Sequence, residues 1–136
     1  MADAPLDSDE LVLKRVPPGL HWLKPGPRLT NANFSIRSHL GEKAVSVSRK
    51  QLTSPKRLLE LVSDEVVQRL GPRSAWHVAE AHIADIRALG FEVVPDPTPD
   101  DPGHALIQPG QRDFGNVFDR RHLAALFRIA PVPFDE

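Results

Sequence analysis

The feature that most constrains this chain is a segment rich in proline and aspartate that separates two short apolar runs. The apolar runs span residues 91–94 and 105–107, and the segment between them holds Pro95, Pro97, Pro99 and Pro102. Proline fixes φ and has no N–H to donate, so this segment cannot be helical and is poorly suited to a central strand. The sequence therefore predicts an extended loop between two strands.

The same segment carries the densest group of ionisable side chains that could take part in catalysis or ligand binding, namely Asp96, Asp100, Asp101 and His104. Three carboxylates and one imidazole could hold a divalent cation such as magnesium, manganese or calcium. Their spacing matches no known metal loop, and Asp-Asp-Pro-Gly is a sequence typical of turns. We therefore predict no metal site and keep His104 as a candidate catalytic residue.

Short alternating patterns elsewhere predict strands, and apolar spacings of three and four predict helices. The predicted strands are Leu11–Val16, 34–37, 44–48, 75–81, 91–94 and His104–Gln108. The predicted helices run from the cap Ser54 to Leu70, over Ile83–Leu89, and from the cap Asp119 to Ala130. This order indicates one α+β domain, a mostly antiparallel, curved sheet with about three helices on one side.

Length and composition limit the class of protein. A chain of 136 residues is one domain by the usual prior, and we assign residues 11–136 to it and residues 1–10 to a flexible acidic tail. There is no cysteine, which excludes disulfides and thiolate metal sites. No apolar run approaches the roughly 20 residues that span a bilayer. We expect a soluble cytoplasmic protein with no membrane contact.

Positive charge is concentrated in the first half of the chain. Ten lysines and arginines, opposed by one glutamate, lie between Lys14 and Arg57. Such a segment can attract an acidic protein or a nucleic acid, or it can be neutralised by the acidic C-terminal half. We predict that this basic surface, residues 14–57, binds a protein partner, with nucleic acid as the alternative. The predicted partner-binding or anion-binding residues are Arg28, Arg37, Arg49 and Lys50.

Several sequence motifs together resemble those of a group of small uncharacterised bacterial proteins. They are K-R-V near the start, V-S-V, T-S-P, L-G-F-E-V-V-P-D-P, P-G-H-A-L-I and R-R-H-L-A, and they cover the chain from Val12 to Ala130. The resemblance implies a bacterial, cytosolic, single-domain protein and transfers no activity.

A looser similarity connects the chain to compact ADP-ribosyltransferase-like toxins. These carry an arginine or histidine on an early strand and a serine on a strand soon after, as Arg15 and Ser46 or Ser48 stand here. The toxins also use a glutamate on a late strand. Glu92 is the nearest candidate, and it is poorly placed beside Phe91.

Two functional hypotheses follow. The leading one is a non-enzymatic binding or accessory protein of a bacterial multi-component system, in host defence or a toxin–antitoxin pair. The alternative is a small enzyme that acts on a nucleotide or nucleic acid, ADP-ribosyltransferase-like, with a site near Arg15, Ser46 or Ser48, and His104. The chain has no Walker loop, no G-x-G-x-x-G and no G-x-S-x-G. The cofactor and the oligomeric state are not predicted.

Overall fold

The computed structural model describes residues 9–18, 21–22, 28–29, 31–34 and 44–130. Its elements, in chain order, are β1 (Leu11–Val16), β2 (His21–Trp22), β3 (Arg28–Leu29), η1 (Asn31–Phe34), β4 (Val45–Arg49), α1 (Pro55–Glu60), α2 (Asp64–Leu70), η3 (Arg73–Ala75), β5 (His77–His82), α3 (Ile83–Leu89), β6 (Glu92–Pro95), β7 (His104–Gln108), α4 (Val117–Ala125) and β8 (Arg128–Ala130).

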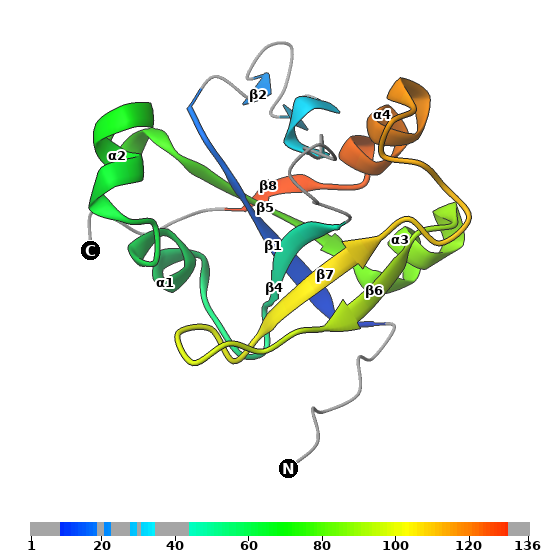
Figure 1. Cartoon of the computed structure of the whole chain (residues 1–136), viewed down its shortest axis with the longest axis horizontal. Helices are drawn as coiled ribbons and strands as arrows, with labels where there is room; N and C mark the ends of the chain where they lie inside the picture. The colour runs from blue at the N-terminus through cyan, green and yellow to red at the C-terminus, as the bar shows by residue number, and fades with distance from the viewer. Residues whose placement is uncertain (1–8, 19–20, 23–27, 30, 35–43, 131–136) are drawn as a thin grey trace.

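A six-stranded sheet in the order β6-β7-β4-β1-β5-β8 forms the centre of the molecule, and β2 and β3 pair separately (Figure 1). Every ladder in the large sheet is antiparallel. The sheet is strongly twisted and does not close, because β6 and β8 each have a single neighbour. The predicted α+β class with one mostly antiparallel sheet is confirmed.

Both faces of the sheet are covered, because successive strand residues point to opposite sides. Val12 and Val16 of β1 face a core shared with α3, α4 and η1, whereas Leu13 faces a second core shared with α1. The prediction that the helices lie on one side is therefore wrong. β1 and β5 carry apolar side chains on both faces, through Val12 and Leu13 and through Val78 and Ala79, and each face therefore needs a covering layer.

The proline- and aspartate-rich segment is the loop of the β6–β7 hairpin. Pro95 pairs with Ala105 at the end of the ladder, and the Asp96 N–H donates to the His104 carbonyl at 2.8 Å. β6 is an edge strand with a neighbour on one side only, so the missing N–H of its proline can face away from the sheet. The loop predicted from the four prolines is confirmed, as are the strands Leu11–Val16 and His104–Gln108.

The long helix predicted from Ser54 to Leu70 is two helices, α1 and α2, with a corner between them. Ser54 caps α1 as predicted, and Ser63 caps α2 by accepting from the Val66 N–H at 3.3 Å. The Arg73 guanidinium donates to the carbonyls of Leu59 and Val62 at the corner. The helix breaks there because a side chain outside it satisfies the carbonyl groups that a continuing helix would use.

Three further expectations differ from the structure. The last helix is capped by Asn116 rather than Asp119, and it ends before a short strand, β8, that the sequence did not indicate. Phe34 ends the short helix η1 instead of starting a strand, and the rest of that predicted strand lies outside the described residues. Glu10, assigned to the acidic tail, is buried in the domain and only 2% exposed.

No helix in the described part of the chain is long and apolar enough to cross a membrane.

Candidate functional site

Strands β1 and β4 separate after a short ladder, and the candidate site lies where they part. The two strands pair only at Val12 with Arg49 and at Leu13 with Ser48, whereas β1 stays paired with β5 to its end at Val16. The second half of β1 thus has a neighbouring strand on one side only. Residues of this half of β1 therefore border cavities at a point where the sheet is open.

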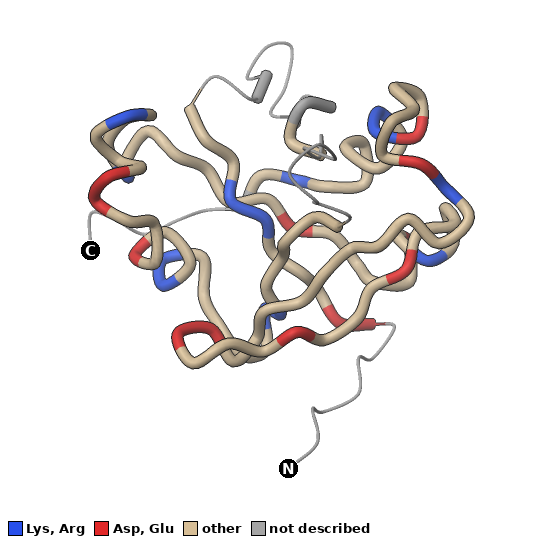
Figure 2. Tube along the Cα trace, in the orientation of Figure 1, with Lys and Arg blue, Asp and Glu red and all other residues tan. Residues whose placement is uncertain are grey.

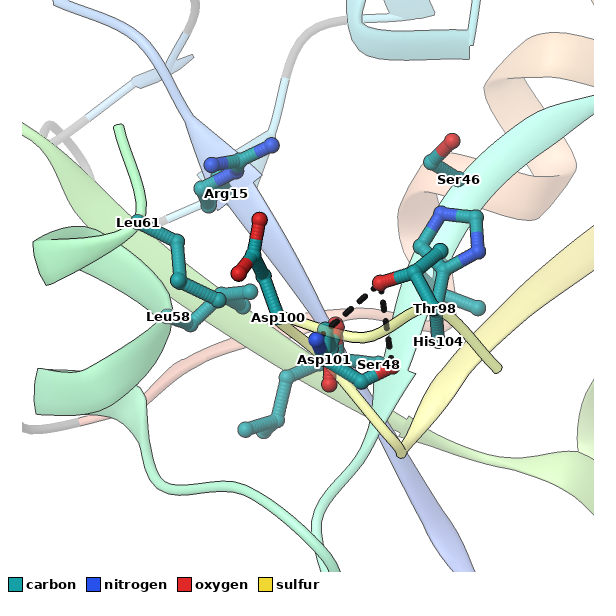
Figure 3. A pocket seen from close by; sticks show the side chains of 11 residues that line it. Arg15, Ser46, Ser48, Leu58, Leu61, Thr98, Asp100, Asp101 and His104 are labelled. Carbon is teal, nitrogen blue, oxygen red and sulfur yellow. Dashed lines mark hydrogen bonds between the residues drawn. The ribbon is translucent and has the colours of Figure 1, made fainter. Parts of the chain in front are cut away.

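A cavity of about 200 Å³ opens at this point (Figure 3). Its polar lining comes from β1, from β4, from the hairpin loop and from β7, and consists of Arg15, Ser46, Ser48, Thr98, Asp100, Asp101 and His104. The apolar lining comes from Leu13, Val47 and two α1-side residues, Leu58 and Leu61. Segments far apart in the chain therefore share one small polar space.

The β4–β7 register explains why the serines and the histidine meet. Ser48 is paired with His104, and Ser46 with Leu106, so Ser46 and His104 are diagonal neighbours on one face of the sheet. Val47, between the two serines, is paired with Ala105 and faces the opposite core. Arg15 reaches the same space from β1, and Figure 3 shows these side chains around the cavity.

His104 is held in one orientation by Asp96. Its Nδ1 lies 2.9 Å from the Asp96 carbonyl oxygen and 3.0 Å from Oδ2 of the same residue. Both partners are acceptors, so Nδ1 carries the proton and donates. In the neutral ring Nε2 is then a free acceptor for a proton, which is the arrangement that a general base requires.

Asp101 anchors the hairpin loop against β4. Its carboxylate accepts from the Ser48 hydroxyl at 2.5 Å and from the Gly103 N–H at 3.0 Å, and the residue is only 6% exposed. Thr98 adds a bond from the Asp101 N–H to its Oγ1, at 3.0 Å. Ser48 is buried because the hairpin loop folds over it, and its bond with Asp101 supports the fold.

Lys14 and Arg15 are two half-buried cations that follow one another on β1, so their side chains leave opposite faces of the strand at this opening. Burial first and the charge of Arg15 second lower the pKa of Lys14 from 10.5 to about 8. Burial also lowers the pKa of Arg15, and the negative charge of Asp101 acts in the opposite direction. Within the described part of the chain, neither cation has a carboxylate within 4.0 Å. Half-buried positive charges without a paired acid are typical of an anion site.

A second cavity, of about 430 Å³, adjoins the first. The two share Arg15, Ser46 and Leu61 in their linings. The second cavity adds Lys14 on one side and apolar side chains on the other, among them Val62, Val66 and Trp76. The Lys14 ammonium also lies 5.8 Å from the centre of the Phe34 ring.

The structure places Arg15, Ser46 and His104, the three predicted catalytic residues, around one cavity whose lining includes neither Arg49 nor Lys50. Arg49 is buried and forms a bidentate ion pair with Glu10, at 2.6 and 3.1 Å. Arg49 was predicted to bind a partner, but it is only 5% exposed and its guanidinium is already paired inside the chain.

Of the other three predicted partner-binding residues, the structure describes the side chain of Lys50 alone. The Lys50 ammonium is exposed and pairs with Glu80 at 2.7 Å. The Arg28 side chain and the whole of Arg37 lie outside the described residues. Figure 2 shows basic and acidic positions interspersed along the described trace, and not gathered on separate sides.

Glu92, the sequence candidate for a toxin-like glutamate, is on the edge strand β6. Its carboxylate accepts from Arg87 and from the Val93 N–H, both at 2.8 Å, and these bonds hold its pKa below the ordinary value. It lines neither of the two cavities.

Lys14, and the role of Asp96 in orienting His104, were not predicted from the sequence. The one signal for Lys14 was a charged residue between Val12 and Val16, at a position where the strand period requires a core side chain. Among the described residues, no group of three or more His, Asp or Glu side chains is placed to hold a metal ion.

No protein-family model, curated protein or solved structure matches this chain.

Proposed function

We propose that this protein is a small enzyme that acts on a nucleotide or the end of a nucleic acid. The observation that carries the proposal is that Arg15, Ser46 and His104, from three different strands, line one cavity. Polar groups that converge in a concave site, beside charges without partners, are a general sign of a catalytic centre.

Arg15 and Lys14 are the residues that recognise phosphate. The guanidinium of Arg15 offers paired donors to a phosphate group, and the nearby Lys14 adds a second positive charge. A bound anion also lowers the cost of keeping both cations half-buried. Phosphate is therefore the ligand group that this pair of residues favours.

His104 is the general base of the proposed site. Asp96 fixes its Nδ1 proton, so Nε2 can accept a proton from an attacking water or hydroxyl. Ser46 is exposed and lies diagonally across from His104, where its hydroxyl can bind the reacting group. The Asp100 side chain lines the same space, and its oxygens suit the hydroxyls of a ribose.

The second candidate is the accessory protein of a bacterial multi-component system, in the cytoplasm, that binds a partner and catalyses nothing. The basic segment 14–57 favours it, because ten of its side chains are positively charged. A defence or toxin–antitoxin role fits either candidate. Catalytic turnover separates the two.

The experiment compares His104→Asn with a matched control. Purified protein is incubated with NAD⁺, ATP, GTP and a short single-stranded RNA, and products are followed by ³¹P NMR and mass spectrometry. Asparagine keeps a donor for Asp96 but has no equivalent of Nε2, so turnover should fall by about 10²-fold or more. His122→Asn changes an exposed histidine on α4 and should have no effect.

Turnover that survives His104→Asn would remove the histidine from the mechanism. Saturable binding of a panel member without turnover in the wild-type protein would contradict the enzyme and support the accessory protein.

A further inference from the structure

The two cavities differ in size in a way that suggests different occupants. Small-molecule sites usually measure roughly 300–1,000 Å³. The cavity beside His104, at about 200 Å³, is too small for a whole nucleotide, whereas its neighbour, at about 430 Å³, is within the usual range. Both are bounded by Arg15, Ser46 and Leu61, so a single ligand can extend from one into the other.

The lining of the larger cavity has a positively charged part and an apolar part. Lys14 and Arg15 supply positive charge on the β1 side. The apolar part of the lining comes from Val62 at the α1–α2 corner, Val66 of α2 and Trp76 just before β5, and Asn33 and Ser63 are polar members of the same lining. A ligand that fits must be anionic at one end and apolar at the other.

The apolar wall is rigid. Trp76 is only 6% exposed, and its indole N–H donates to the Gly71 carbonyl at 3.2 Å, which fixes the plane of the ring. Arg73 ties the helix corner by its bonds to Leu59 and Val62. A fixed apolar wall suits a flat, stiff group better than a flexible chain, because little conformational freedom remains to be lost on binding.

We propose that the larger cavity is the base subsite: it holds the nucleobase of the nucleotide whose phosphate lies at Lys14 and Arg15, so that the reacting group reaches His104. This inference rests on the proposed function and adds to it the position of the base. It makes Val66 a residue that determines specificity, although it lies on a different element from every residue of the proposed chemistry.

The test measures ADP and inorganic pyrophosphate binding by calorimetry at pH 7. ADP carries a base and pyrophosphate does not, while both present the phosphates. Val66→Phe fills the cavity and should weaken ADP binding by about tenfold, the usual size of a base-stacking contribution, with pyrophosphate unchanged. Val67→Phe is the matched control, because Val67 is a half-buried neighbour on the same helix that does not line the cavity. Arg15→Gln should weaken both ligands.

The outcomes separate the two proposals. If ADP binds Val66→Phe as tightly as wild type while Arg15→Gln weakens both ligands, the base subsite is wrong and the phosphate site stands. If neither ligand binds the wild-type protein, both are wrong. If Val66→Phe lowers the melting temperature, Val66→Ile gives the same comparison with a smaller change in volume and should still affect ADP more than pyrophosphate.

Discussion

At the scale of single residues, Lys14 is the most unusual group in the chain. It interrupts the core-facing row of β1, between Val12 and Val16, and burial lowers its pKa to about 8. A positive charge in such a position costs stability that an apolar residue would not. A bound anion would offset that cost.

Lys14→Met should therefore stabilise the protein at pH 7. Between pH 8 and pH 10.5 the unfolded chain holds the Lys14 proton more tightly than the folded chain, so the wild-type free energy of unfolding rises with pH across that window. The penalty is complete below pH 8. Because the side chain is half-buried and partly solvated, we expect a gain of about 1–2 kcal/mol at pH 7, disappearing near pH 10.5. Urea unfolding at both pH values measures it.

Lys50→Met is the control for this prediction, since Lys50 is exposed and paired with Glu80. A Lys14→Met gain that is the same at both pH values would show that the charge of Lys14 carries no penalty.

The buried pair of Glu10 and Arg49 is the opposite case, a charge that is fully partnered. Glu10→Gln removes the carboxylate charge that faces the buried Arg49 guanidinium and should lower the free energy of unfolding by about 3–5 kcal/mol. Chemical denaturation measures the loss. Glu80→Gln, which breaks the exposed pair with Lys50, should cost at most about 1 kcal/mol. Equal losses in the two variants would contradict the distinction between buried and exposed pairs.

At the scale of elements, the hairpin loop depends on a close approach to β4. The Arg49 N–H donates to the Gly103 carbonyl at 2.8 Å, and a Cβ on residue 103 would lie 3.1 Å from the Arg49 carbonyl oxygen and 3.0 Å from Leu52 Cβ. Backbone cannot move aside as a flexible side chain can. A side chain at residue 103 would therefore push the loop and β4 apart, because both contacts are tighter than ordinary van der Waals contact.

Gly103→Ala should lift the loop from β4 and lower the free energy of unfolding by about 1–3 kcal/mol. It should also weaken the Ser48–Asp101 bond and with it the wall of the small cavity. Equilibrium unfolding, together with the chemical shift of the His104 ring, measures both effects. Gly115→Ala is the control, because a Cβ there meets only the side chain of Asp113. An unchanged His104 signal in Gly103→Ala would show that the loop does not depend on this contact.

The elements also show where sequence patterns are sufficient and where they are not. The strands Leu11–Val16 and His104–Gln108 were predicted with their correct bounds, because prolines and a change of period mark their ends. The corner between α1 and α2 was missed, because the apolar spacing continues in phase through it and its cause, Arg73, lies beyond both helices.

At the scale of the whole molecule, the order of strands decides which residues meet. Arg15, Ser46 and His104 could be proposed from residue type, but their neighbourhood depends on β4 lying between β1 and β7, which no local pattern specifies. The second helical layer and the opening between β1 and β4 also arise from long-range packing. The apolar and polar pattern of β1 alone could not predict that Lys14 lies at that opening.

Amide hydrogen exchange should follow the same strand order. The inner strands β7, β4, β1 and β5 should exchange slowest where they are paired on both sides, whereas the edge strands β6 and β8 should exchange fastest. Addition of pyrophosphate should slow exchange on the second half of β1 and in the hairpin loop, with little change in α3. Mass-spectrometric exchange measures this, and protection spread evenly over the chain would contradict a ligand site at the β1–β4 opening.

The pairing of Ser48 with His104 and of Val47 with Ala105 has a consequence for how variants of this protein fail. A slip of β4 by one residue against β7 would turn Ser46 and Ser48 toward the core and Val45 and Val47 toward the cavity. A shift in register that misplaces the site residues therefore also destabilises the fold, because it removes valines from the apolar core. Damage that spares stability but abolishes function should then be confined to the few side chains that line the two cavities.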